Sequence, residues 1–556
     1  MVPLDGLAHE AAPAPVPVGA ARPWWEGRWF VAAMILLAVV PLVHPAIPPL
    51  VDLPGHMGRF KVARDLATSP YLWQWYSFHW MPIGNLGVDV LVYPLARWIG
   101  VEAATKLVVM AIPALTVAGM LWVAREVHNR LPPTVAFALP LAYSHPFLFG
   151  FVNFSLSMAF ALMALGLWLR LGRLGRVRLR AAIFLPLSFV IFFTHTFGWG
   201  TMGLMCFSAE AVRQHDAGKS WWRAGIRAAY HASAMALPVL LMILWRTEAH
   251  GGVTLGWFAW GHKWEYIQRV LRDRWQVWDL VCAGVIYALP LLAVIHRRLA
   301  LSRNLAFSAL ILSGCFVLLP RVIFGSAYAD MRIVPYIAAL LVLAIRFRFD
   351  TDLRLARLLA WTGLAFLLAR TATTTASLWI AADHQARQLA AIDQLPRGAR
   401  VAAMVWAPCD GWELRRGDHL PSMVIVRRDG FANDQWPMAG SSLLTEHYVE
   451  AGWQGHDPAQ IVRDPGCRFE GRPIEQALAQ LPRGAFDYLW LIDLPPVPPG
   501  WLDGWRPLWS GDGSALFERD IMKPGGAKRK SGTPPPESLP ARSGVALLRT
   551  AFPARG

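Results

Sequence analysis

The sequence predicts an all-α polytopic membrane protein with a small α/β domain near its C-terminus. Hydrophobic residues make up 55% of the 556 residues, and charged residues only 16%. Near-continuous apolar runs of spanning length recur through the first part of the chain, which soluble domains do not show. From about Gln385 the apolar runs become short and are separated by turn-rich segments, as in a soluble domain.

The net charge of +16 is compatible with this class. Membrane proteins collect Lys and Arg in their cytoplasmic loops, which produces such a balance without any nucleic acid. No nucleic-acid partner is therefore expected. The sequence also lacks the P-loop, HExxH, GxSxG and Cys/His zinc motifs, so the common soluble chemistries have no support.

The apolar runs predict about eleven transmembrane helices. They lie at 29–48, 101–124, 132–147, 150–169, 181–194, 197–212, 228–245, 277–296, 304–320, 331–346 and 355–372. Basic clusters, such as the one over Arg170–Arg180, fall in alternate connections and can all lie on one side. The positive-inside rule then puts the N-terminus in the cytoplasm and the C-terminal domain outside. We expect a multi-pass protein of the bacterial inner membrane with a periplasmic or extracellular C-terminal domain.

The chain is expected to have four parts. Residues 1–27 are rich in Pro and Ala and predict a disordered cytoplasmic N-terminus. Residues 28–395 form the transmembrane domain, whose first external loop covers 49–100. Residues 396–520 form the external α/β domain, and the basic, Pro/Gly/Ser-rich residues 521–556 form a disordered tail.

Interfacial helices are predicted in two external connections. In "PGHMGRFKVARDLA" of the first loop, one apolar face recurs at helical spacing, made by Met57, Phe60, Ala63 and Ala67. The aromatic stretch "YLWQWYSFHW" follows, and then a second short helix, "GVDVLVYPLARW". Between the seventh and eighth spans, "GWFAWGHKWEYIQRVLRDRWQVWD" mixes Trp and Tyr with charges in the same way.

The C-terminal domain is predicted to contain buried strands at "GARVAAMVW" and "FDYLWLIDL" and an edge strand at "SALFERD". Cys409 and Cys467 both lie in this domain. If the domain is exported, these two thiols enter an oxidising space and can form its only disulfide. The sequence does not give the distance between the two residues. A separation above about 7 Å between their Cα atoms in the structure would exclude the bond.

Ionisable residues directly after the first span carry the functional interpretation. "LVDLPGHMGR" places Asp52, His56 and Arg59 within a few residues of the membrane boundary. Asp52 alone could act as a cap at the N-terminus of the following helix. Capping does not account for His56 and Arg59, which follow at i+4 and i+7.

Further polar residues gather at external helix ends. They are Asn85, Asp89, His145, Asn153, His195, Arg321 and Arg332. Each has a local explanation as a cap or a solvated side chain. Together they lie on one side of the membrane, and ionisable groups embedded there indicate function because burying them is costly.

The chain resembles the GT-C superfamily of membrane glycosyltransferases, which includes protein O-mannosyltransferases and bacterial aminoarabinose transferases, in its long first external loop with an Asp just beyond the first span, its two interfacial helices, its eleven or so spans and its terminal external domain. Four short motifs look more closely like those of bacterial GT-C-like membrane proteins with a D-x-P-x-H-x-x-R loop. They are "DLPGHMGR", "GNLGVD", "GFVNFSL" and "ADMRIVP", within a resemblance that covers residues 29 to about 395. The resemblance implies a GT-C-like fold. The chain departs from the O-mannosyltransferase and oligosaccharyltransferase branches because Leu53, not a second acid, follows Asp52. A divalent metal and a protein acceptor therefore stay open.

The resemblance implies transfer of a sugar from a polyprenyl-phosphate donor to an acceptor hydroxyl at the external face of the inner membrane. The acceptor is an envelope glycan, lipid or protein. Asp52 and His56 are the expected catalytic residues, because one carboxylate can act as general base. Substrate binding is expected from Arg59, Asn85, Asp89, His145, Asn153, His195, Arg321 and Arg332. Two alternatives stay open: a transporter or lipid flippase, and a catalytically silent GT-C-like scaffold.

Overall fold

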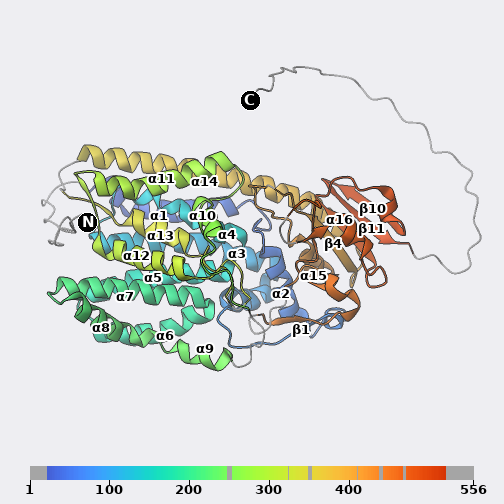
Figure 1. The fold of residues 1–556 in the computed structure, drawn as a ribbon, viewed down its shortest axis with the longest axis horizontal. Helices are drawn as coiled ribbons and strands as arrows, with labels where there is room; N and C mark the ends of the chain where they lie inside the picture. Colours follow the sequence, from blue (N-terminus) through green and yellow to red (C-terminus); the bar gives the residue numbers. More distant parts are fainter. Residues whose placement is uncertain are drawn as a thin grey trace, which may run out of the picture. The chain divides into compact units, whose positions relative to one another are not determined.

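A computed structural model describes residues 22–246, 253–323, 325–348, 353–409, 411–436, 442–467 and 471–520. Most of this chain is helical, and a sheet lies near its C-terminal end (Figure 1). The helices are α1 (Arg28–Leu37), α2 (Leu53–Asp65), α3 (Gly87–His128), α4 (His145–Phe149), α5 (Val152–Arg173), α6 (Val177–Thr194), α7 (Thr196–Asp216), α8 (Trp221–Ala232), α9 (Pro238–Arg246), α10 (Trp260–Gln268), α11 (Gln276–Ile295), α12 (Arg303–Leu318), α13 (Val334–Leu343), α14 (Leu353–Gln388), α15 (Met423–Arg428) and α16 (Ile474–Ala479).

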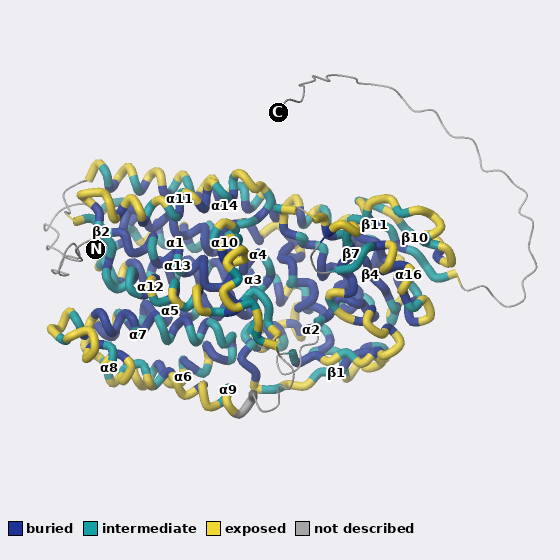
Figure 2. The backbone as a smooth tube through the Cα atoms, viewed as in Figure 1, coloured by how far each residue is buried: buried dark blue, intermediate teal, exposed yellow. Residues whose placement is uncertain are grey.

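Five helices are long and apolar enough to cross a membrane, which supports the membrane class: Gly87–His128, Val152–Arg173, Val177–Thr194, Gln276–Ile295 and Leu353–Gln394. Shorter apolar helices cover Arg28–Leu42, Val135–Phe149, Arg303–Leu318 and Val334–Leu343. Helices α7 and α9 stand where two further spans were predicted, so the count of eleven stays a prediction. In Figure 2 the outward sides of α8, α11 and α14 are exposed, whereas α5 and α13 are largely buried.

Helix α3 joins the second predicted interfacial helix to the second predicted span. Its regular geometry breaks at Gly100, where φ is 79° and ψ is 164°. A side chain at such a positive φ would be strained, whereas glycine adopts it without a Cβ penalty. Before this break, Leu91, Leu95 and Trp98 are exposed apolar residues, which agrees with a helix that lies in the membrane interface.

Helix α2 forms where the first interfacial helix was expected, but it does not lie at a surface. His56, Met57, Arg59 and Phe60 are all buried, because α2 packs between α3 and the segment around α15 in the C-terminal domain (Figure 1). The predicted apolar face is therefore only part of what α2 buries. Periodicity showed one apolar stripe but not that a second layer covers the opposite side of the helix.

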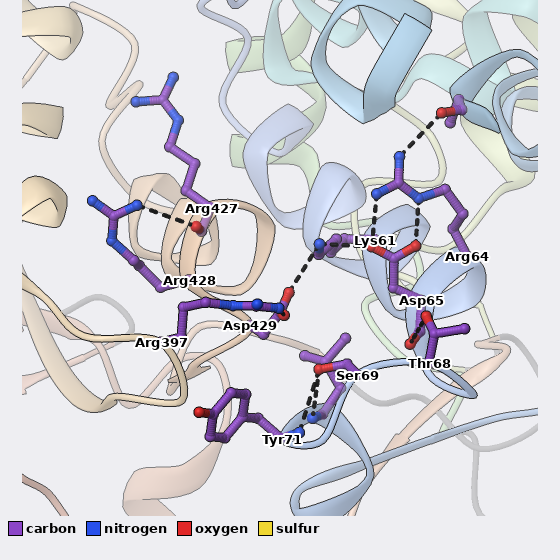
Figure 3. Close-up of polar contacts among 12 residues, drawn as sticks. Lys61, Arg64, Asp65, Thr68, Ser69, Tyr71, Arg397, Arg427, Arg428 and Asp429 are labelled. Atoms are coloured by element: carbon purple, nitrogen blue, oxygen red, sulfur yellow. Dashed lines mark hydrogen bonds and ion pairs between the residues drawn. The ribbon is translucent and has the colours of Figure 1, made fainter. Parts of the chain in front are cut away.

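Ion pairs hold α2 against the C-terminal domain (Figure 3). The ammonium of Lys61 lies 2.6 Å from an oxygen of Asp65 and 2.8 Å from an oxygen of Asp429, the residue that ends α15. Asp429 also pairs with Arg397. A two-stranded antiparallel sheet, β1 (Tyr76–Phe78) with β6 (Leu444–Glu446), joins the first external loop to the same domain.

The main sheet has the order β10-β11-β9-β4-β7-β8, with β5 paired to β4. Its strands are β4 (Arg400–Trp406), β5 (Phe431–Ala432), β7 (Ile461–Arg463), β8 (Arg472–Pro473), β9 (Tyr488–Ile492), β10 (Trp505–Gly511) and β11 (Ser514–Arg519), and β2 (Leu299–Leu301) pairs with β3 (Ile345–Phe347) elsewhere. The two strands predicted as buried, β4 and β9, lie next to each other in parallel at its centre. The predicted edge position of "SALFERD" is wrong, because β11 lies between β10 and β9.

The structure also bears on the predicted disulfide and on the predicted disordered ends of the chain. Cys409 and Cys467 form a disulfide, with their Cα atoms 5.3 Å apart. At the other end, residues 24–26 form a 3-10 helix whose Trp25 is buried, so the predicted disorder of 1–27 is wrong for that segment. The remaining predicted disordered residues, 1–21 and 521–556, lie outside the described residues.

Candidate functional site

A cavity of about 1260 Å³ lies where α2, several helix ends and the C-terminal domain meet. This volume exceeds the ~300–1,000 Å³ of sites for drug-sized ligands, so it has room for a large substrate. Seven of the ten predicted site residues line it: Asp52, His56, Arg59, Asn85, Asn153, His195 and Arg332. Asp52 and Arg332, which are far apart in the sequence, therefore line the same cavity.

Asp52 occupies the position directly before α2. Its side chain makes no capping hydrogen bond, so the capping alternative is wrong. Its backbone N–H donates to the Phe149 carbonyl at 3.0 Å, which ties the residue to the segment before α5. Gly150 has a φ of +100°, and a Cβ there would lie 2.6 Å from the Asp52 nitrogen, so a glycine is needed for this close approach.

The electrostatics of Asp52 set its proton affinity near neutrality. Burial raises the pKa of this carboxyl to about 7. His419 and Arg332 lower the pKa, whereas Asp457 and Asp418 raise it. Desolvation outweighs the effect of the two cations. A carboxyl with a pKa near the working pH is well matched to a general base.

His419 of the C-terminal domain faces Asp52 and was not predicted. Its Nε2 lies 3.8 Å from an oxygen of Asp52 and 4.0 Å from an oxygen of Asp457. Its Nδ1–H donates to the Asp434 carbonyl at 2.9 Å, which orients the ring. Burial lowers the pKa of His419, but the carboxylates of Asp457, Asp52 and Asp434 outweigh it and raise the pKa above its ordinary value.

His56 lies beside this pair but stays neutral. Burial, together with the charges of Arg59 and His419, holds its pKa well below the ordinary value. Its ring meets the Trp436 ring edge-on at 5.3 Å, and Trp436 also contacts the His419 ring at 4.4 Å. A neutral His56 can exchange a hydrogen bond with a substrate but contributes no positive charge.

Arg332 is a buried cation with an unusual set of partners. Its guanidinium carbon lies 4.4 Å from the ring centre of Phe151, 5.8 Å from that of Phe154 and 5.3 Å from that of Phe197. One terminal nitrogen donates to the Ser326 hydroxyl at 3.2 Å and the Ala327 carbonyl at 3.3 Å. Its Nε has no hydrogen-bond partner.

In the part of the chain that the structure describes, no carboxylate lies within 4 Å of the Arg332 guanidinium. The side chain is only 6% exposed. A buried charge without a close ion pair is costly, so such a group indicates a place for an anionic ligand.

His195 stands at the junction of α6 and α7. Its Nδ1 accepts a hydrogen bond from the Phe197 N–H at 3.1 Å and so caps the N-terminus of α7. In a neutral ring with Nδ1 as acceptor, Nε2 carries the proton. His195 can therefore present a hydrogen-bond donor beside Arg332 in the cavity.

Arg59, Asp89 and Asn153 form a network that orients the cavity wall. Arg59 donates two hydrogen bonds of 2.9 Å to the Asp89 carboxylate. The Asn153 amide donates to the same carboxylate at 3.1 Å and to the Asn85 carbonyl at 3.0 Å. The network ties α2, α3 and α5 together. Asp89 is buried and is not part of the cavity lining, so the structure gives it a positioning place instead of substrate contact.

His145 and Arg321 do not line the main cavity. They line a second, smaller cavity of about 210 Å³ beside it. The residues that sequence analysis missed, His419, Trp436, Asp418 and Asp457, all come from the C-terminal domain. No local motif marks them, since only the packing of that domain on α2 brings them to Asp52.

The next feature is whether side chains are arranged to bind a metal ion. Among the residues with described positions, no three His, Cys, Asp or Glu side chains are arranged to hold a metal ion. No residue is therefore assigned to a metal.

These helices and this cavity define a polytopic membrane protein with a polar cavity between its helix ends and a C-terminal sheet. No family model matches the chain, and no curated protein matches it. Among solved structures it is similar to ArnT from Cupriavidus metallidurans in the apo state, with 11% identity, 88% of this chain and 97% of that chain covered, and a TM-score of 0.46. It is also similar to ArnT from Cupriavidus metallidurans bound to undecaprenyl phosphate, with 10% identity, 90% and 99% covered, and a TM-score of 0.42. Likeness at this level of identity concerns the fold alone.

Proposed function

We propose that this protein transfers a sugar from a polyprenyl-phosphate donor to an acceptor hydroxyl at the external face of the inner membrane. The observation that carries the proposal is one cavity that holds both Asp52, a carboxyl with a pKa of about 7, and Arg332, a buried cation. Asp52 and Arg332 influence each other electrostatically. A base and an anion-binding group in one cavity suit group transfer from a phosphate.

In the proposed step, Asp52 takes the proton of the acceptor hydroxyl as the oxygen attacks the anomeric carbon of the sugar. The bond between that carbon and the phosphate oxygen breaks, and its electron pair leaves with the polyprenyl phosphate. The donor phosphodiester thereby becomes a monophosphate with one more negative charge. Arg332 stabilises this charge, and an Nε2–H of His195 can donate to it.

His419 positions and tunes Asp52. Its fixed orientation by the Asp434 carbonyl keeps Nε2 toward the carboxylate. A protonated His419 favours the ionised form of Asp52, which is the form that acts as a base.

The apolar side of the cavity suits an isoprenoid chain. Phe149, Leu204, Met242 and Leu319 line it, together with Ile323. Burying an apolar chain against such a wall is favourable in proportion to the area removed from water. The polar groups, in contrast, lie at helix ends: Asp52 directly precedes α2, His195 directly precedes α7 and Arg332 lies just before α13. This supports an enzyme over a transporter, for which a midplane site is expected.

The test is transfer of a radiolabelled sugar from its polyprenyl phosphate to membranes of the source organism. Asp52→Asn should lower the rate at least about 100-fold, because loss of a general base costs that much. Asp383→Asn, an exposed carboxylate outside the cavity, should leave the rate unchanged. Arg332→Gln should weaken binding of the polyprenyl phosphate itself, measured with the lipid alone.

Retained transfer by Asp52→Asn would remove the proposed base and with it the mechanism. If the wild-type protein instead moves the lipid-linked sugar across proteoliposomes without transferring it, the protein is a flippase. Folding of each variant is checked by its thermal unfolding in detergent.

A further inference from the structure

The second cavity is strongly basic. Four arginines line its volume of about 210 Å³: Arg269, Arg272, Arg321 and Arg415. Only two carboxylates, Glu265 and Asp418, are among its lining residues. The cavity is smaller than the ~300–1,000 Å³ of sites that enclose a whole small molecule, so it has room for one group of a larger ligand.

Two of the four arginines form ion pairs with these two acids. Arg269 pairs with Glu265 at 3.1 Å, and Arg415 pairs with Asp418 at 3.0 Å. Arg272 donates to backbone carbonyls instead, to Trp412 at 2.5 Å and to Gly411 at 2.9 Å. Burial and the nearby charges of Arg269 and Arg415 lower the pKa of Arg272 to about 10. Two acids face four guanidinium groups, so the cavity carries an excess of positive charge.

His145 gives a second, independent indication of a ligand. It lines this cavity and is 4% exposed. Neither of its ring nitrogens has a hydrogen-bond partner. A buried polar group without a partner costs about 1–3 kcal/mol, which a ligand that accepts a hydrogen bond from the ring would recover.

The two cavities share a wall. Val51, Phe149, Tyr328, Arg415 and Asp418 line both. Val51 directly precedes Asp52, the proposed base. A single molecule can therefore place a hydroxyl at Asp52 and a neighbouring group in the second cavity.

We propose that the second cavity binds an anionic group, a phosphate or a carboxylate, carried by the acceptor. Guanidinium groups hold both anions through paired hydrogen bonds, and His145 adds one more donor. The assignment to the acceptor rests on the proposed sugar transfer, because the donor phosphate is already placed at Arg332.

Anion binding is tested first, without any acceptor. Full-length Arg332→Gln protein in detergent is titrated with inorganic phosphate and, separately, with acetate in a calorimeter. The substitution at Arg332 removes the anion position of the main cavity, so binding of one equivalent should remain. Adding Arg269→Gln should weaken that binding at least tenfold. Adding Arg97→Gln, a cation on α3 that lines neither cavity, should not change it.

The acceptor assignment is tested with the transfer assay. Arg269→Gln should raise the amount of acceptor membrane needed for half-maximal transfer at least tenfold and leave the half-saturating donor concentration unchanged. A phosphate-only or acetate-only response in the calorimeter identifies which anion the cavity prefers.

Three outcomes separate the proposals. If Arg332→Gln protein binds neither anion, the second site does not exist. If it binds an anion but Arg269→Gln leaves the acceptor dependence unchanged, the site does not serve the acceptor. If the wild-type protein transfers no sugar while anion binding at Arg269 persists, the proposed function fails and the anion site alone stands.

Discussion

At the scale of single residues, Asp52 shows how burial tunes a reactive group. An ordinary carboxyl group has a pKa well below 7, and a nearby cation lowers that pKa further. Here desolvation dominates and moves the pKa of Asp52 to about 7. The same burial holds His56 neutral, although both residues lie at the start of one helix. Burial therefore favours the neutral form of both side chains.

This pKa predicts the pH dependence of transfer. The base acts only when deprotonated, so the rate should rise as pH increases through about 7 and then level off. His419→Gln removes a charge that lowers the pKa of Asp52, so the rise should move to higher pH. The measurement is the initial rate from pH 5 to 9 for both proteins. An unshifted profile for His419→Gln would show that the two groups do not interact.

The residues that could be predicted from sequence are those at helix ends. Asp52 and Arg332 each flank an apolar run, and the shared side of the membrane limits where they can meet. His419 and Asp457 could not be predicted, because they stand in irregular segments far along the chain. Their place beside Asp52 depends on how two parts of the chain pack, which local patterns do not encode.

At the scale of elements, α2 lies between α3 of the helical part and α15 of the C-terminal domain. Its apolar spacing was visible in the sequence, but its burial on nearly all sides was not. Similarly, "SALFERD" was readable as a strand, whereas its inner position follows from the pairing of β10, a strand with mostly exposed residues and a Pro. Element type follows local pattern, but neighbours follow from tertiary packing.

The Lys61 ion pairs should stabilise this arrangement. Lys61→Met keeps the apolar stem but leaves Asp429, whose side chain is 4% exposed, without that partner. We expect a loss of about 1–3 kcal/mol, the cost of a buried charged group that loses a hydrogen bond. Thermal unfolding in detergent gives the measurement, and Lys106→Met, whose ammonium donates to the Val43 carbonyl, is the control. Equal unfolding temperatures for the Lys61→Met and wild-type proteins would contradict a stabilising role of the Lys61 ion pairs.

At the scale of the whole molecule, the described helices and the sheet belong to one compact unit. Residues of both parts line the main cavity. The predicted boundary at 395–396 separates the helical part from the sheet part. Across this boundary, α2 contacts α15 and β1 pairs with β6. The Cys409–Cys467 disulfide lies in the sheet part.

The orientation of this molecule in the membrane stays a prediction with a direct test. Reporter fusions within Arg170–Arg180 and at Gln454 should report opposite compartments, the first cytoplasmic and the second external. Cys409 and Cys467 should also be oxidised in cells, since structural disulfides persist outside the cytoplasm. Fusions that report the same compartment would overturn the count of eleven spans.

Asp52 and His419, which face each other in the proposed reactive centre, lie far apart in the sequence, and this has a consequence for biosynthesis. The ribosome completes the segment with Asp52 early, and the helices that follow can insert in the membrane while translation continues. His419 and Asp457 emerge only near the end. Under the proposed mechanism, a nascent or stalled chain therefore lacks the groups that face Asp52, and activity should appear only once synthesis is complete.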